Sequence, residues 1–213
     1  MTQGYFYFIA DDFYAKFPND SLRTNRGSGH DRPCFFAFRD NKDSDILWCV
    51  PISSKVEKYK IIANKKVSKQ IKQGVVNPIC ETIRFGTVLG KERAFLIQNI
   101  FPVTQEYITG TYLYKGTSTA VRIDKETEKD IIVSARKVLR RVFRGNSPYL
   151  VFADVKAMKR TLVDDLKKRK DIANDKPSTA KSWCEKTLQS AQKLADAHNL
   201  NNDMPEIDDD GSR

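Results

Sequence analysis

One short segment of the chain joins an apolar, strand-like run to two hydroxyl side chains and a lysine. The run Leu47–Val50 is followed by Pro51 and then, one residue later, by Ser53, Ser54 and Lys55. Because proline cannot donate to a strand ladder, we expect pairing to weaken there and the serines to lie at a strand end. If a helix begins directly afterwards, its free N–H groups and the Lys55 ammonium make a phosphate-binding site. The alternative is that a serine simply caps the helix.

Other polar side chains stand near the ends of further apolar runs. Arg32 precedes the aromatic run Cys34–Phe38, where its guanidinium could clamp a phosphate or be an ordinary surface group. Gln98 and Asn99 lie near the end of another run, where amides could read base edges or belong to the core. Together these residue types suit the binding of a phosphodiester.

Several other kinds of chemistry lack the residues they need. His30 and Cys34 stand four residues apart with no second pair beside them, and the four cysteines show no C-x-x-C spacing. Zinc sites and disulfide frameworks are therefore unexpected. The glycine-rich signatures of nucleotide-binding loops are missing as well. We expect neither a metal nor an organic cofactor.

No part of the sequence is suited to a membrane. No apolar run approaches the roughly 18 residues that a membrane span needs. The N-terminus also lacks the basic start of a signal peptide. We therefore expect a cytoplasmic protein without a membrane partner.

The net charge is unevenly distributed along the chain. The 213 residues include 37 Lys and Arg and 27 Asp and Glu, which gives a formal net charge of +10. Residues 1–150 hold 25 basic and 15 acidic side chains, whereas residues 151–213 hold 12 of each. The whole excess thus belongs to the first part. Such an excess is typical of proteins that bind nucleic acid, although it also serves solubility.

The elements that position these groups are those of a mixed domain in residues 1–150. Short aromatic and β-branched runs predict strands, and the polar residues 41–44 predict a hairpin loop with antiparallel pairing. We predict an α+β fold with a compact, strongly twisted antiparallel sheet or small barrel, flanked by helices. The predicted strands are Gly4–Ile9, Cys34–Phe38, Ile46–Val50, Thr82–Leu89 and Ala94–Ile100.

Two helices are predicted within this domain. Asp124 is a plausible N-cap for a helix with acids in its first turn and an apolar stripe, and Gly145 can end it. A second helix lies within Val56–Gln73, in a region with seven lysines from Lys55 to Lys72. Residues 151–213 are predicted to form a helical extension, with a helical pattern from Val155 to Lys170, and an acidic solvated tail.

Several of these segments, in order, resemble the endoribonuclease toxins of type III (protein–RNA) toxin–antitoxin systems. The resemblance is closest to the CptN branch of the ToxN/AbiQ group and covers residues 4–150. It implies a strongly bent antiparallel sheet flanked by helices, as in other small ribonuclease toxins. The segments are FYFIADDF, RPCFFAF, ILWCVPISSKVEKYK, AFLIQNIFPVTQEYI and the acidic-to-basic helix after Asp124.

The resemblance also implies an activity and a partner. It implies a sequence-specific, metal-independent endoribonuclease that cleaves cellular or phage mRNA, in growth inhibition and phage defence by abortive infection. The inhibitor would be a small RNA antitoxin, a repeated pseudoknot, bound in a closed cyclic protein–RNA assembly. Because RNA carries its own 2′-OH nucleophile, the expected products are a 2′,3′-cyclic phosphate and a 5′-hydroxyl.

Carried over residue by residue, the family motif assigns candidate roles. Ser54 is the first candidate for the catalytic hydroxyl and Ser53 is the second. Two cations would neutralise charge on the phosphate: Arg32 and Lys55, with Lys58 as the substitute for Lys55. We interpret most of the basic excess as the grip on the inhibitory RNA. At the family's functional tyrosine Phe13 and Tyr14 compete, and only Tyr14 has a hydroxyl. The candidate RNA-binding residues are Tyr14, Lys58, Lys65, Lys66, Gln98, Asn99, Arg136 and Arg140.

Two other functions stay open on the sequence alone. A non-catalytic RNA-binding protein could use the same basic face, and it would bind RNA in a salt-dependent way without cleaving it. A structural or protein-interaction domain could carry the charge for solubility, and it would retain no nucleic acid.

Overall fold

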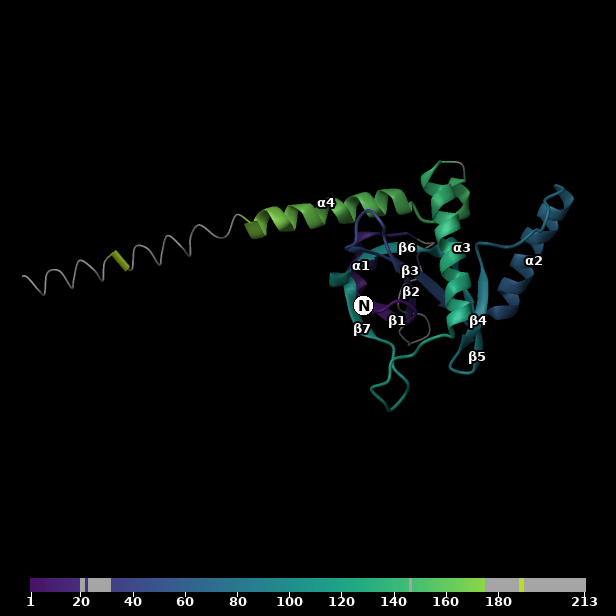
Figure 1. Cartoon of the computed structure of the whole chain (residues 1–213), viewed down its shortest axis with the longest axis horizontal. Helices are drawn as coiled ribbons and strands as arrows, with labels where there is room; N and C mark the ends of the chain where they lie inside the picture. The colour runs from purple at the N-terminus through teal and green to yellow at the C-terminus, as the bar shows by residue number, and fades with distance from the viewer. Residues whose placement is uncertain (20–21, 23–31, 146, 175–187, 190–213) are drawn as a thin grey trace, which may run out of the picture. The chain divides into compact units, whose positions relative to one another are not determined.

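A computed structural model describes residues 1–19, 22, 32–145, 147–174 and 188–189. The chain divides into two compact units, Met1–Asp164 and Asp165–Arg213. The predicted α+β class is confirmed: a twisted antiparallel sheet is flanked by helices (Figure 1). The predicted acidic tail lies outside the described residues.

The sheet of the first unit contains seven described strands. Their order is β4-β5-β3-β2-β1-β7, and β6 pairs with β3 off this path. All of these pairings are antiparallel, and the sheet is open and not closed into a barrel. The strands are β1 (Phe6–Ile9), β2 (Cys34–Arg39), β3 (Ile46–Ser53), β4 (Arg84–Val88), β5 (Lys91–Phe95), β6 (Phe101–Thr104) and β7 (Ile108–Thr111).

Strand β3 changes its partner at Pro51. On one side it pairs with β2 along most of its length, with Cys34 opposite Pro51. On the other side Ile46–Cys49 pairs with β6, whereas Ile52 and Ser53 pair with β5. Because proline has no N–H to offer, the partner can change at this residue without leaving a donor unpaired. The strand therefore continues to Ser53.

The predicted strand Ala94–Ile100 is wrong as a single element. Strand β5 ends at Phe95, the 3₁₀ turn η1 (Ile97–Asn99) follows, and β6 begins at Phe101. The turn is closed by hydrogen bonds from Asn99 N to Leu96 O (2.9 Å) and from Ile100 N to Ile97 O (3.0 Å). This turn lets β5 and β6 pair with successive parts of β3, a long-range arrangement that the local pattern does not encode.

The two predicted helices of the domain are confirmed. Helix α2 spans Val56–Lys72 and α3 spans Lys125–Phe143. Asp124 caps α3, because its Oδ1 accepts a hydrogen bond from Thr127 N at 2.8 Å. Gly145 follows the helix with φ +81°, the left-handed region in which glycine ends helices.

Two further α-helices and two further 3₁₀ turns complete the elements of the described chain. Helix α4 contains the predicted Val155–Lys170 segment and continues to Asn174. Helix α1 was not predicted, and its Phe13 packs on the ring of Phe101 at 5.2 Å. No helix in the described residues is long and apolar enough to cross a membrane. The further elements are α1 (Asp11–Lys16), η2 (Gln105–Tyr107), η3 (Pro148–Leu150) and α4 (Val155–Asn174).

The apolar core has a large and a small part. The large part lies between the sheet, α1, α3 and the start of α4 and includes Trp48, Phe35 and Phe101. The small part lies under α2, where Tyr59 and Ala63 contact a few side chains that include Ile83 and Leu96. Helix α2 is therefore anchored along one face, and its opposite face is exposed.

Candidate functional site

The end of β3 places two serines in different surroundings. Ser53 is the last residue of the strand, pairs with Ala94 and is buried. Its Oγ accepts a hydrogen bond from Lys55 N at 3.3 Å. Ser54 is the first residue beyond the strand, and its side chain is exposed. The strand end therefore presents the Ser54 hydroxyl to solvent and holds Ser53 directly behind it.

Helix α2 begins directly after these serines. Its N-cap residue is Lys55, and no side chain caps the helix. Neither serine is the N-cap residue, although Ser53 Oγ accepts a hydrogen bond from the N–H of Lys55. Lys55 and Lys58 are both exposed beside this helix end. Uncapped N–H groups, the positive end of the helix dipole and two ammonium groups favour an anion here.

Arg32 lies at the same edge of the sheet. Strand β2 starts at Cys34, which pairs with Pro51. Arg32 stands two residues before Cys34, and Ser53 stands two residues after Pro51. If the antiparallel register is extended by two residues, Arg32 is expected beside Ser53. Arg32 is partly exposed. The role of Arg32 at this edge therefore stays a prediction from the register.

Tyr14 reaches this region from the interior. It is buried on α1, and its hydroxyl is hydrogen-bonded to the side chain of Cys34. Burial, together with the neighbouring Cys34 and Cys49, raises the pKa of Tyr14 far above its usual range. Burial also raises the pKa of the Cys34 thiol to about 12. The phenol therefore stays protonated near neutral pH and is unsuited to the role of a general base.

Lys65 and Lys66 are neighbours in the sequence, but they point in different directions. Lys65 is exposed on the outer side of α2. The Lys66 ammonium is half-buried and donates to Thr82 Oγ1 (2.7 Å) and Gln98 Oε1 (2.8 Å). Desolvation lowers the pKa of Lys66. Lys66 is thus engaged in the interior, with neutral hydrogen-bond partners.

The two amides predicted to read bases are buried. Gln98 and Asn99 lie in η1 and are 4% and 6% exposed. Gln98 accepts from Lys66, and its carbonyl accepts from Phe152 N at 2.9 Å. The structure therefore holds Lys66 and Gln98 together and places both amides in the buried turn η1.

These placements predict that replacing Lys66 lowers the stability of the protein, whereas replacing its neighbour Lys65 does not. Lys66→Met is expected to lower the free energy of unfolding by about 1–3 kcal/mol, because Thr82 and Gln98 lose their shared donor. Lys65→Met on the exposed face should change it by less than about 0.5 kcal/mol. Chemical denaturation of both variants beside the wild-type protein measures the difference. Equal stability of the two variants would contradict the placement.

The basic end of α3 is partly neutralised by a single carboxylate. Glu81 pairs with Lys137 and with Arg141, whose Nη1 lies 3.4 Å from Glu81 Oε2. The Arg136 guanidinium lies 4.7 Å from the ring centroid of Phe38, a cation–π contact. Arg140 is exposed and has no ion pair among the described residues. Arg136 and Arg140 thus form a second basic region, on a different helix from the strand-end site.

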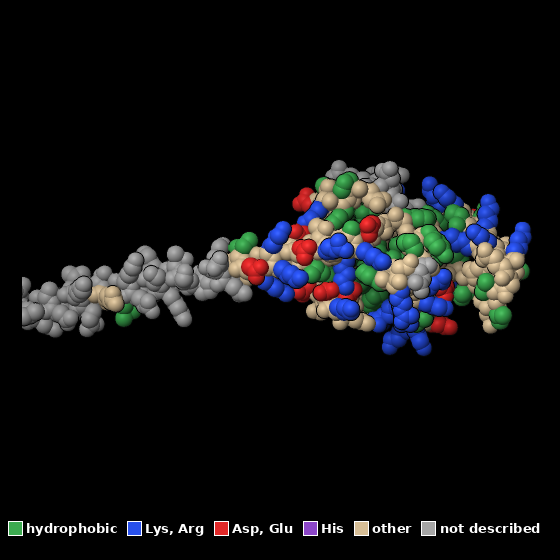
Figure 2. All heavy atoms as spheres, turned by 90° about the horizontal axis from the view of Figure 1, so that it is seen from above, with side chains coloured by type: hydrophobic (Ala, Val, Ile, Leu, Met, Phe, Trp, Pro, Cys, Tyr) green, Lys and Arg blue, Asp and Glu red, His purple; other side chains and the backbone are tan. Residues whose placement is uncertain are grey.

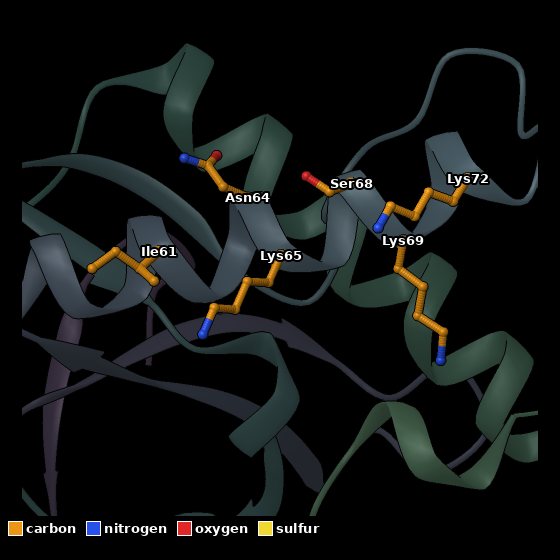
Figure 3. Close-up of a pocket in the computed structure, with 6 residues that line it drawn as sticks. All are labelled: Ile61, Asn64, Lys65, Ser68, Lys69 and Lys72. Atoms are coloured by element: carbon orange, nitrogen blue, oxygen red, sulfur yellow. The ribbon is translucent and has the colours of Figure 1, made fainter.

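The outer face of α2 carries polar groups that the sequence alone did not single out. A shallow hollow follows this face, and Asn64, Ser68, Lys69 and Lys72 line it together with Ile61 and Lys65 (Figure 3). In Figure 2, Lys and Arg side chains project from the right-hand side of the view, where α2 lies, and others are spread over the rest of the visible face. The signal was present in the sequence, since residues three and four apart share one side of a helix.

In the part of the chain that the structure describes, no three His, Cys, Asp or Glu side chains are placed to hold a metal ion. No protein-family model matches the sequence, and no curated protein matches it.

Among solved structures, the fold is similar to that of AbiQ, a lactococcal anti-phage endoribonuclease belonging to the type-III toxin-antitoxin system. The TM-score is 0.55 at 16% sequence identity, and the match covers 78% of this chain and 99% of the AbiQ chain. The two proteins therefore share a fold over nearly the whole length of AbiQ.

Proposed function

We propose that this protein is an endoribonuclease toxin of a type III toxin–antitoxin system, closest to the CptN branch, and that it cleaves RNA at the end of β3. The observation that carries the proposal is the exposed Ser54 and Lys55 at the uncapped start of α2. Hydroxyl, N–H and ammonium groups are adjacent in the chain there, and groups of these kinds suit a phosphate. The fold shared with the endoribonuclease AbiQ supports this proposal.

The proposed reaction uses the nucleophile that RNA itself supplies. The 2′-oxygen loses its proton and bonds to the adjacent phosphorus, the bond from phosphorus to O5′ breaks, and O5′ takes up a proton. Ser54 would donate a hydrogen bond to a phosphoryl oxygen, with Ser53 behind it, and Lys55 and Arg32 would neutralise the developing charge. The products are a 2′,3′-cyclic phosphate and a 5′-hydroxyl.

The proposed partner is an RNA. AbiQ belongs to a type-III toxin–antitoxin system, and we extend to this chain an antitoxin made of a repeated RNA pseudoknot in a closed cyclic protein–RNA assembly. The target would be cellular or phage mRNA cut at a specific sequence, with growth inhibition and phage defence as the result. The exposed basic groups of α2 and α3 support binding to a polyanion.

Cleavage is expected to continue in EDTA, since the proposed steps need cations and hydrogen-bond donors that the protein itself provides. The rate with EDTA should stay within about twofold of the rate with Mg²⁺, because a lost metal contribution would cost several kcal/mol. Gel analysis of a cleaved transcript measures the rate. A strict Mg²⁺ requirement would overturn this mechanism.

One expression experiment separates the proposed toxin from a non-catalytic RNA-binding protein. The gene is expressed alone and together with its upstream DNA. The toxin predicts growth arrest and cleaved transcripts in the first case, and rescue with a co-purifying small RNA in the second. A protein that retains RNA in both cases without producing cleaved transcripts would be a non-catalytic binder.

A further inference from the structure

Four exposed lysines form a stripe along the outer face of α2. Lys58, Lys65, Lys69 and Lys72 are spaced by seven, four and three residues, so they share one side of a helix. This side is opposite to Tyr59 and Ala63, which are buried. We call these four residues the lysine stripe. From Lys58 to Lys72 it extends about 21 Å at 1.5 Å per residue.

Two other lysines of α2, Lys60 and Lys66, are engaged elsewhere. Lys60 pairs with Glu57 at 3.2 Å and with Glu92 at 2.8 Å. Lys66 is engaged with Thr82 and Gln98. The four stripe lysines form no ion pair among the described residues. Lys60 is thus neutralised by carboxylates and Lys66 is held by neutral acceptors, whereas the four stripe lysines stay uncompensated.

Helix stability does not explain the stripe. Lysines three and four residues apart repel one another on a helix surface. A cation near the N-terminus of a helix, such as Lys58, also opposes the helix dipole, although Lys69 and Lys72 in the last turn are favoured. The uncompensated outer face therefore suits a polyanionic ligand.

The groups between the lysines indicate what kind of polyanion fits. Asn64 and Ser68 line the same hollow as Lys65, Lys69 and Lys72 (Figure 3). Amide and hydroxyl groups beside lysines are common partners of the phosphates and sugars of nucleic acids. Ile61 is the one apolar residue that lines the hollow, and the other five carry amide, hydroxyl or ammonium groups, so the hollow has no aromatic anchor of the kind found in protein interface cores.

We propose that the lysine stripe is a track for the sugar–phosphate backbone of the single-stranded RNA that flanks the cleavage site. The inference rests on the proposed function, because the stripe begins at Lys58, one helical turn from Lys55 at the strand-end site. The contacts are to the backbone, so the track binds RNA independently of sequence. The track holds several nucleotides on one side of the scissile phosphate, and an RNA inhibitor that covers it blocks substrate.

The test compares two triple variants of the full-length protein. Lys65→Gln, Lys69→Gln and Lys72→Gln together remove three stripe charges, and Lys115→Gln, Lys125→Gln and Lys129→Gln remove three exposed charges elsewhere. The probe is a fluorescent 20-nucleotide single-stranded RNA of mixed sequence, titrated at several salt concentrations. The stripe variant should bind this RNA at least about tenfold more weakly. The slope of log binding constant against log salt concentration should be shallower by about 2, because each lost phosphate contact contributes roughly 0.7. The control variant should bind like the wild-type protein.

Cleavage kinetics distinguish an error in the proposed RNA track from an error in the proposed enzymatic function. With a transcript that the wild-type protein cleaves, the stripe variant should raise KM and leave kcat unchanged. An unchanged salt slope, or an equal loss in both triple variants, would overturn the track even if the enzyme is active. Absence of cleavage by the wild-type protein would overturn the proposed function, and the binding comparison would still decide the track. Tighter binding of polyglutamate than of RNA at equal salt would reject RNA as the occupant.

Discussion

Replacing Ser54 by alanine is expected to lower the rate of RNA cleavage by about 10²–10³-fold. Ser54 is the exposed hydroxyl at the end of β3, beside the uncapped start of α2, where it can donate to a phosphoryl oxygen. Lys55→Ala is expected to have a similar effect, because its ammonium would neutralise charge on the same phosphate. Single-turnover cleavage of a transcript and growth on induction measure both losses.

Matched controls show whether the loss is specific. Ser118→Ala removes an exposed hydroxyl from a loop, and Lys125→Ala removes an exposed lysine from the start of α3. Both should keep full activity. The free energy of unfolding of the Ser54 and Lys55 variants should lie within about 0.5 kcal/mol of the wild-type value, since neither side chain is buried. Full cleavage by both site variants would remove this site assignment.

Replacing Lys159 by methionine is expected to destabilise the first unit by about 3 kcal/mol. The Lys159 ammonium lies 2.8 Å from Asp40 Oδ1 and 2.8 Å from Asp43 Oδ2, with side chains 14%, 13% and 36% exposed. It links the start of α4 to the loop between β2 and β3. Removing it leaves Asp40 with its charge but without its cationic partner. The melting temperature should fall by about 6–12 °C, measured by calorimetry.

The same contact makes stability depend on pH. Desolvation raises the pKa of Asp40, but hydrogen bonds from Lys159, Lys42 N and Trp48 outweigh it and hold the pKa below its usual value. A carboxyl with a lowered folded-state pKa stabilises the fold above its unfolded pKa, near 4, and loses that contribution as the pH falls through the folded value. Stability should therefore fall below about pH 4.

At alkaline pH the contribution of this contact to stability falls as the pH rises. Desolvation lowers the pKa of Lys159, but hydrogen bonds to Asp40 and Asp43 outweigh it and raise the pKa. The contribution of Lys159 is thus complete below about pH 10.4 and is lost as the pH rises through the raised value. Arg160→Met on the same helix is the control, because Arg160 is exposed. Equal melting temperatures of the two variants at pH 7 would contradict the role of Lys159.

The strand-end site could be predicted because its parts are adjacent in the chain. Pro51 marks the place where pairing changes, and the serines and Lys55 follow within four residues. The helix that begins after them is predicted within the lysine-rich segment Val56–Gln73. The cap of α3 at Asp124 is equally local. Such features depend on backbone geometry within a few residues, which composition and spacing largely determine.

The arrangement around β5 and β6 could not be predicted in the same way. The run Ala94–Ile100 is apolar as far as Ile97 and contains no glycine or proline, so its pattern predicts one strand. In the structure η1 interrupts it, because β6 pairs with β3 before Pro51 and β5 pairs with β3 beyond it, and the turn connects these two strands. Short elements such as α1 are stabilised by tertiary packing, here of Phe13 on Phe101, rather than by their own propensity.

The sequence by itself determined the α+β class, the basic character of the first 150 residues and the contiguous Ser53–Ser54–Lys55 motif. Tertiary structure alone decided which polar groups face outward. Lys65 and Lys66 have identical side chains, yet Lys66 is held by Thr82 and Gln98, 16 and 32 residues away, whereas Lys65 is exposed. The physical reason is that burial of a polar group depends on whether a distant partner satisfies it, and the identity of that partner is set by how the strands pair.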